Sequence, residues 1–150
     1  MATEIQITRC LSLTQPWATL VAIGAKKYET RSWLTKYRGW IAIHASKGFP
    51  RDCVELCLEE PFASVLVAAG VEKPKDLPVG KVICVAHLVD CISTHVWAPN
   101  RDMNEYQFGD YSKDRYAWKL ADVKRVDPFA AKGSLGLWTL PTPIHHAETP

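Results

Sequence analysis

Apolar and polar residues alternate along three stretches of the chain, which predicts β-strands at residues 5–13, 40–45 and 116–126. Side chains two positions apart on a strand share a face, so we expect Trp40, Ala42 and His44 on the same side of the sheet. A histidine in this position is more typical of a hydrogen-bonded core residue than of a catalyst. Residues 81–92 are almost continuously apolar and predict a central strand that is buried on both faces.

Apolar residues at helical spacing predict three short helices. The first extends from Pro16, which suits a first helical turn, to Gly24, which suits a helix end, and it contains Trp17. A second helical region covers residues 50–69 and is broken at Pro61, which gives two short helices. We interpret these two helices as a cover for the core.

The last third of the chain contains a long polar connection and a proline-rich end. A connection as long as residues 93–114 is expected to be a functional lid or to contain a short helix. Residues 141–150 contain three prolines and are expected to be frayed. Because no repeat or boundary divides the sequence, we predict one domain over residues 1–150. Five or six strands with a few short helices favour an α+β fold, a small mixed β-barrel flanked by helices.

Composition narrows the class of protein. With 47% hydrophobic and 23% charged residues, the 150-residue chain is typical of a globular domain. No apolar run reaches the ~20 residues that span a bilayer, and the first residues lack the pattern of a secretion signal. Five cysteines are an odd number and show no paired spacing. We therefore expect a cytoplasmic protein without membrane attachment.

Positive charge is concentrated in residues 26–51. This window carries seven Lys or Arg side chains and a single carboxylate, that of Glu29, so its net charge is +6 while the rest of the chain carries −4. Tyr and Trp residues are interleaved with these cations. Cations that hold phosphates and aromatic rings that stack on bases are typical of single-stranded nucleic-acid sites. A solvated basic face above core aromatics remains the alternative interpretation.

The window begins with a turn and a strand that carry its most concentrated chemistry. Glu29 and Arg31 lie two apart on the predicted strand, so they share a face at a separation of roughly 6.5–7 Å. The adjoining turn contains Lys26 and Lys27. An exposed ion-pair cluster and a binding site both remain open on these residues alone.

Four segments together resemble a known family. The pattern Gly-x-Lys-x-x-Glu-x-Arg at residues 24–31 resembles the signature of the ASCH domain (activating signal cointegrator homology), a branch of the PUA-like superfamily. Residues 11–17 look like the strand–Pro–aromatic lead-in of this family, residues 80–82 like the start of its central strand, and residues 132–138 like its closing segment. The resemblance spans roughly residues 9–140, and the start of the chain is similar to small single-domain members.

The resemblance implies a PUA-like β-barrel with a basic cleft between the barrel and the helices, where RNA or a modified nucleobase binds. Carried over by position, Lys26, Glu29 and Arg31 would line this cleft. Trp17 would border it, and Lys132 with Ser134 would close it. We expect Trp17, Trp33 or Tyr111 to stack on a base. The expected partner is single-stranded RNA or a modified nucleoside, and no obligate protein partner is expected.

Two enzymatic alternatives follow from the same resemblance. Bacterial amidohydrolases of the family remove the acetyl group of N4-acetylcytidine, with a threonine where this chain has Glu29. Thr30 is adjacent but is expected to face away from Glu29. In this interpretation Lys26 is a general base or electrophilic anchor whose partner is Glu29, and burial must lower the pKa of the lysine.

Other ASCH proteins are metal-dependent nucleases of single-stranded RNA. Carboxylates in residues 102–114 would then hold magnesium, although their spacing does not single out a metal site. No other cofactor is expected. A protein-interaction domain that uses the aromatic residues of 93–114 is the third interpretation.

Overall fold

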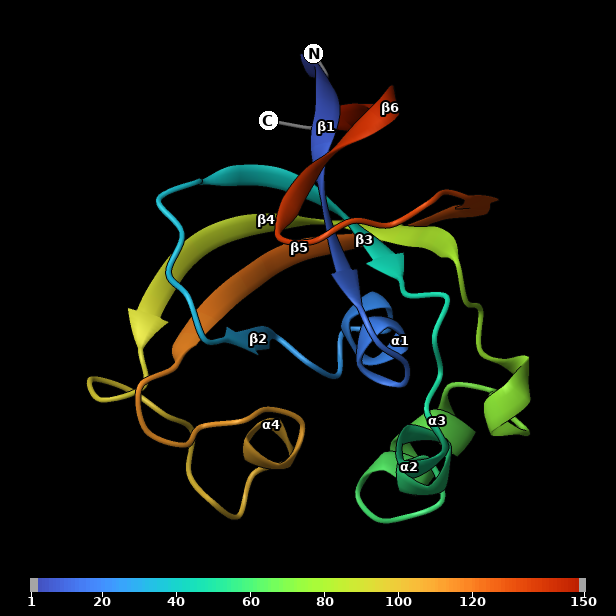
Figure 1. Cartoon of the computed structure of the whole chain (residues 1–150), viewed down its shortest axis with the longest axis vertical. Helices are drawn as coiled ribbons and strands as arrows, with labels where there is room; N and C mark the ends of the chain where they lie inside the picture. The colour runs from blue at the N-terminus through green and yellow to red at the C-terminus, as the bar shows by residue number, and fades with distance from the viewer. Residues whose placement is uncertain (1–2, 149–150) are drawn as a thin grey trace.

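Six strands form one mixed sheet in the order β2-β5-β4-β3-β1-β6, in a computed structural model that describes residues 3–148 (Figure 1). β1 runs parallel to β3, and every other neighbouring pair is antiparallel. The strands are β1 (Thr3–Leu13), β2 (Tyr28–Arg31), β3 (Gly39–Ala45), β4 (Lys81–Ser93), β5 (Tyr116–Ala130) and β6 (Leu137–Glu148).

Short helices cover the concave side of this sheet. They are α1 (Trp17–Ala22), α2 (Arg51–Leu56), α3 (Phe62–Ala68), a 3₁₀ helix η1 (Pro74–Asp76) and α4 (Asn104–Gln107). Figure 1 shows the sheet arching over α1, with α2, α3 and α4 farther from it. No helix within residues 3–148 is long and apolar enough to cross a membrane.

The start of α1 is fixed by a buried glutamine. Gln15 is fully buried; its Oε1 accepts a hydrogen bond from the Thr19 amide at 3.0 Å, and its Nε2 donates to the Pro78 carbonyl at 2.9 Å. The first bond satisfies an amide that the helix itself leaves without a partner. Gln15 therefore fixes the position of Trp17 at the first turn of α1.

Two core layers meet at α1. Leu11, Ile43 and Trp118 belong to a buried cluster between the sheet and one side of α1, and Leu20 on the other side packs with Phe108 and the α3 residues. Burial of this apolar surface is the dominant favourable term in folding. α1 is thereby the element that joins the sheet to the outer helices.

Most of the predicted elements are present. The strands expected at 5–13, 40–45, 81–92 and 116–126 correspond to β1, β3, β4 and β5, and β4 is central, with residues 82–86 all buried. The helical region divides at Pro61 into α2 and α3 as expected. The polar connection contains α4.

The prediction of a closed barrel is wrong. β2 and β6 are the two edges of the sheet, and no backbone pairing joins them within residues 3–148. β2 has only four residues, all of them paired with β5. The strands therefore form an open, strongly curved mixed sheet rather than a barrel.

Residues 141–148, for which the sequence predicts a frayed end, are paired as a strand. They belong to β6, which is antiparallel to β1, and residues 149–150 lie outside the described part of the chain. The pairing shifts between Ile7 and Arg9, so Pro141 and Pro143 fall in an irregular part of an edge strand. Proline is tolerated there because no ladder hydrogen bond needs its missing N–H.

Candidate functional site

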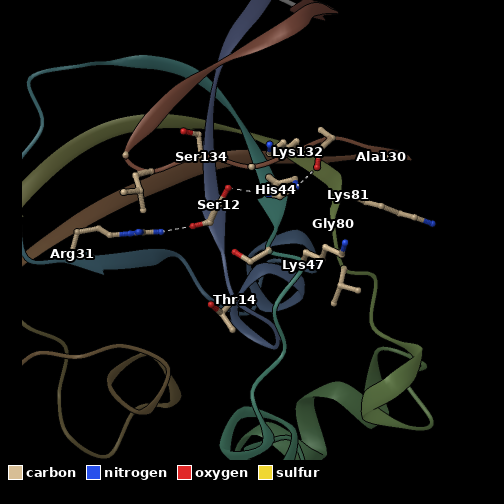
Figure 2. A pocket seen from close by; sticks show the side chains of 16 residues that line it. Ser12, Thr14, Arg31, His44, Lys47, Gly80, Lys81, Ala130, Lys132 and Ser134 are labelled. Carbon is tan, nitrogen blue, oxygen red and sulfur yellow. Dashed lines mark hydrogen bonds between the residues drawn. The ribbon is translucent and has the colours of Figure 1, made fainter.

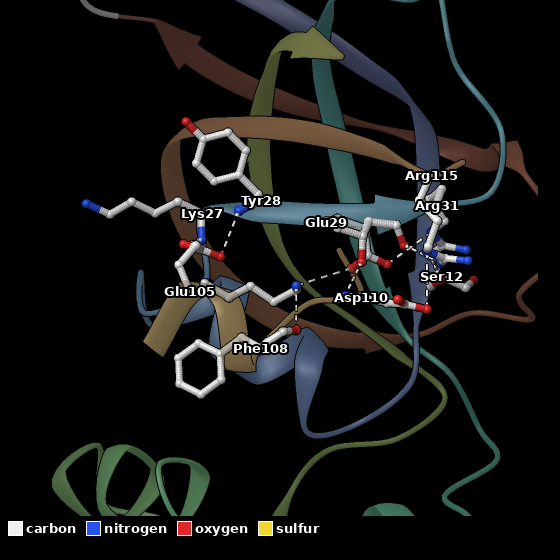
Figure 3. A network of polar contacts seen from close by, with 11 residues as sticks. Ser12, Lys27, Tyr28, Glu29, Arg31, Glu105, Phe108, Asp110 and Arg115 are labelled. Carbon is white, nitrogen blue, oxygen red and sulfur yellow. Dashed lines mark hydrogen bonds and ion pairs between the residues drawn. The ribbon is translucent and has the colours of Figure 1, made fainter. Parts of the chain in front are cut away.

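Three charged side chains of the β2 region form a continuous chain of contacts (Figure 3). Lys26 Nζ lies 3.6 Å from Glu29 Oε1, and Arg31 Nε lies 3.0 Å from Glu29 Oε2. Arg31 Nη2 then donates a hydrogen bond of 2.7 Å to the Ser12 carbonyl on β1. The Glu29 carboxylate is thus held from both sides, and the guanidinium extends from β2 to β1.

Lys26 is buried, with 1% of the residue exposed. Its amine donates a hydrogen bond of 2.7 Å to the carbonyl of Phe108, which follows α4. Burial lowers the pKa of Lys26, and the negative charges of Glu29 and Glu105 oppose that shift. The lysine therefore ties β2 to the segment that follows α4.

Glu105 makes a second connection between the same two segments. Its Oε1 accepts a hydrogen bond from the Lys27 amide at 2.8 Å, and its Oε2 accepts one from the Tyr28 amide at 3.3 Å. Burial raises the pKa of Glu105, although these amides and the nearby lysines favour its charged form. α4 is held against the start of β2 as a result.

A cavity of about 500 Å³, which we call the Glu29 pocket, lies between β2, the segment after α4 and the α2–α3 region. Its lining residues include Trp17 together with Phe62 and Phe108, whose side chains are buried. Its charged residues are Glu29, Glu59, Glu60 and Asp110, with Arg31 and Arg115. Carboxylates therefore outnumber cations in this pocket.

A larger cavity of about 1190 Å³, which we call the lysine pocket, lies on the other side of Arg31 (Figure 2). It shares Ser12, Thr14 and Arg31 with the Glu29 pocket. Its cations are Arg31, Lys47, Lys81 and Lys132, and none of the residues described as lining it is Asp or Glu. The two cavities thus have opposite charge balance.

A buried polar network supports the lysine pocket. His44 is 2% exposed; its Nε2 donates to the Ala131 carbonyl at 2.8 Å, and its Nδ1 lies 2.9 Å from Ser12 Oγ. Because a carbonyl only accepts, Nε2 carries a proton. Trp138 Nε1 donates to the same hydroxyl at 3.0 Å. The prediction of a hydrogen-bonded core histidine is confirmed.

Gly133 packs directly on this network. A Cβ at this position would lie 2.7 Å from His44 Cε1 and 2.8 Å from Ser12 Oγ. Cβ atoms in proteins essentially never approach a non-bonded atom this closely. The segment that carries Lys132 and Ser134 therefore fits only with glycine between them.

The residues predicted to form one cleft are distributed over two cavities. Trp17 and Glu29 line the Glu29 pocket, Lys132 and Ser134 line the lysine pocket, and Arg31 lines both. Lys26 lines neither, because it lies behind Glu29 and Phe108. The ligand contacts of all these residues stay predictions.

Trp33 and Tyr111 also line neither cavity. Trp33 packs edge-on against Trp118 with ring centroids 4.7 Å apart and is 36% exposed. Tyr111 stacks on Tyr106 at 5.6 Å and contacts Trp97 edge-on at 6.1 Å. Burial raises the pKa of the Tyr111 hydroxyl. Both rings pack against other aromatic rings.

The sequence interpretation missed several residues of the lysine pocket. Lys47 lies inside the basic window but carried no further signal, and Lys81 follows a glycine at the start of the central strand. Ser12 and His44 occupy neighbouring strands whose parallel pairing places them opposite each other. That pairing is a long-range property that a local pattern does not contain.

Three carboxylates of residues 102–114 already have partners within the protein. Glu105 accepts from backbone amides, Asp110 Oδ2 lies 3.4 Å from Arg115 Nε, and Asp114 Oδ1 lies 2.8 Å from His95 Nε2. Within residues 3–148, no three His, Cys, Asp or Glu side chains converge as metal ligands would.

Comparison with known proteins assigns the chain to a family. Residues 11–130 match the family described as the ASCH domain. The chain is 35% identical over 142 residues to activating signal cointegrator 1 of Homo sapiens, and 33% identical over 142 residues to its Mus musculus counterpart. Each match covers 91% of this chain and 23% of the relative, so the chain spans less than a quarter of those proteins.

Proposed function

The chain belongs to the ASCH domain family, a group of PUA-like domains often linked to RNA binding, and from that premise we propose that it binds single-stranded RNA or a modified nucleobase. The base enters the Glu29 pocket. The observation that carries this proposal is the position of Arg31, which is held between Glu29 and Ser12 at the boundary of a cavity that Trp17 and Glu29 line and a cationic one.

The residues of the Glu29 pocket match the chemistry of a base. Carboxylate oxygens accept hydrogen bonds from the N–H groups of a nucleobase, and aromatic rings contact its faces. Glu29 is held in place by Lys26 and Arg31, so little conformational freedom is lost when a base binds. In this proposal Lys26 positions Glu29 and the wall at Phe108.

A hydrolase built on Lys26 and Glu29 is the weaker candidate. Burial lowers the pKa of Lys26, as a general base requires, but the amine already donates to the Phe108 carbonyl and lines neither cavity. Thr30 lines the Glu29 pocket, and its Oγ1 accepts a hydrogen bond of 2.8 Å from the Asp110 amide, which holds this hydroxyl against the segment after α4. We therefore propose binding rather than turnover.

Fluorescence anisotropy with a labelled single-stranded RNA of about eight nucleotides tests the proposal. We expect affinity to fall steeply between 50 and 300 mM salt, because phosphate contacts release counterions. Glu29→Gln should weaken binding roughly tenfold, whereas Glu55→Gln, on an exposed carboxylate paired with Arg51, should not. An RNA that does not bind, or binding indifferent to Glu29→Gln, would overturn the assignment.

The same protein and RNA samples test whether the protein catalyses hydrolysis. The protein is incubated with N4-acetylcytidine and with the RNA, each with and without magnesium, and products are followed by mass spectrometry. We expect intact substrates. Release of cytidine would establish an amidohydrolase, and shortened RNA would establish a nuclease.

A further inference from the structure

The lysine pocket differs from the Glu29 pocket in its charge. Lys47, Lys81 and Lys132 join Arg31 there with no carboxylate among the lining residues, while the Glu29 pocket has four carboxylates and two arginines. Ser12 and Arg31 belong to both walls. A single ligand that spans the two pockets must therefore carry its negative charge at one end only.

We propose that the lysine pocket is a phosphate-binding site, so that the ligand is a nucleotide whose phosphate lies on the opposite side of Arg31 from its base. This inference rests on the proposed function for the base, but the phosphate site stands on its own residues. A free base or a nucleoside would fill only the Glu29 pocket.

The donors of the lysine pocket suit a tetrahedral oxyanion. Lysine and arginine supply charge-assisted hydrogen bonds, which are roughly twice as strong as neutral ones. Hydroxyl groups add further donors from the lining residues Thr14, Ser46 and Ser134. Figure 2 shows the Arg31 guanidinium pointing across the pocket toward Ser12, and the Lys81 side chain extending away at the far end.

The cationic segments are held by backbone contacts. The Ala131 amide donates to the Gly80 carbonyl at 3.1 Å, and the Gly80 amide donates to the Ala45 carbonyl at 2.7 Å. The Ala131 carbonyl accepts a hydrogen bond from His44 Nε2. The segments with Lys132, Lys81 and Lys47 therefore converge before any ligand binds, which reduces the entropic cost of binding.

Terminal and internal phosphates share this chemistry. A cavity of about 1190 Å³ is large enough for either a terminal phosphate or a phosphodiester with its neighbouring sugar. The ligands in the experiment below distinguish a terminal phosphate from an internal phosphodiester.

Amide chemical shifts of the isotope-labelled chain locate each ligand. The ligands are inorganic phosphate, the four common nucleosides, their 5′-monophosphates and dinucleoside monophosphates. The variant is Lys47→Ala with Lys132→Ala, and its matched control is Lys119→Ala with Lys124→Ala, which removes two exposed lysines of β5 that line neither pocket.

Phosphate alone should shift the amides of residues 46–47, 80–81 and 131–136, and nucleosides should shift those of 29–31 and 107–110. Nucleotides should shift both sets. The pocket variant should weaken nucleotide binding roughly tenfold and leave nucleoside binding unchanged, and the control should match wild type. Tighter binding of the monophosphate identifies a terminal phosphate, and tighter binding of the dinucleotide identifies a phosphodiester.

Phosphate-induced shifts that avoid the lysine pocket would overturn the inference, as would equal nucleotide affinity of the pocket variant and its control. The wild-type shift map answers the question even if the variant folds poorly. If phosphate shifts the lysine pocket while no nucleoside or RNA reaches Glu29, the proposed function fails and the phosphate site survives.

Discussion

The Arg31 guanidinium donates a hydrogen bond of 2.7 Å to the Ser12 carbonyl, and this side-chain bond connects β2, one edge of the open sheet, to β1 near the other edge. The last β1 residue paired with β6 is Leu11, so the Ser12 carbonyl lies just beyond that ladder. An arginine side chain thus bridges a sheet that backbone pairing does not close, and it separates the two pockets.

Removal of this bridge should destabilise the fold. Arg31→Ala removes the side-chain donor from the Ser12 carbonyl and leaves the Glu29 carboxylate with Lys26 alone, and we expect a loss of about 1–3 kcal/mol in the free energy of unfolding. Arg38→Ala is the control, because that exposed side chain lies 3.7 Å from Asp90, and it should cost less than about 0.5 kcal/mol. Urea denaturation measures both, and equal losses would contradict a bridging role.

Gly133→Ala should displace the segment that carries Lys132. The added methyl group would meet His44 and Ser12 at less than 3 Å, so the segment must move. We expect phosphate binding to weaken roughly tenfold by titration calorimetry, with a stability loss of about 1–3 kcal/mol. Gly48→Ala is the matched control, since nothing lies within 4 Å of its added methyl group. Unchanged phosphate affinity in Gly133→Ala would show that this segment does not hold the anion.

Most strands and helices were predictable from the sequence because each depends on residues close together in the chain. The alternation at β3 and the apolar run at β4 reflect burial on one or both faces, and Pro61 separates α2 from α3 as its ring requires. Closure of the sheet depends instead on how far each strand curves and pairs. The four residues of β2 gave no indication that they would pair on one side only.

The site was predictable only where its residues lie close together in sequence. Glu29 and Arg31 share a face of β2, as period-2 alternation predicts, and they are in contact. The lysine pocket draws Lys47, Lys81 and Lys132 from three distant segments, so its charge appears only after folding. Burial of Lys26 was equally invisible, because Phe108, the partner of its amine, lies 82 positions away.

The buried thiol of Cys84 predicts a loss of stability in alkali. Burial raises its pKa from 9.0 to about 12, so above pH 9 the unfolded chain loses this proton while the folded chain keeps it. The folded state then binds more protons, and the free energy of unfolding falls as pH rises from 9 toward 12. The contribution of this one group is at most about 1.4 kcal/mol per pH unit.

Denaturation of wild type and Cys84→Ala at pH 8, 9 and 10 isolates that contribution. The stability advantage of wild type over the variant should shrink above pH 9, because the variant lacks the titrating thiol. Cys91→Ala, which removes a half-exposed thiol of the same strand, controls for the loss of a cysteine. A constant difference between wild type and Cys84→Ala across this range would contradict the prediction.

Lys26→Met distinguishes a positioning lysine from one that touches the ligand. Methionine keeps the length and the buried apolar stem but removes the amine, so the Phe108 carbonyl loses its donor and Glu29 keeps only Arg31. Residues 108–110 form one wall of the Glu29 pocket, and we expect their amide hydrogens to exchange roughly tenfold faster. Nucleoside affinity should fall with that loosening.

Lys27→Met is the matched control for this lysine, because Lys27 is the exposed neighbour and its backbone amide, not its side chain, contacts Glu105. It should leave both amide exchange and affinity unchanged. If Lys26→Met abolished binding while the exchange of residues 108–110 stayed at the wild-type rate, the amine would act on the ligand itself. The hydrolase interpretation would then regain its general base. Faster exchange together with weaker binding would instead place Lys26 behind the pocket wall, where burial and a carbonyl acceptor hold it in this structure.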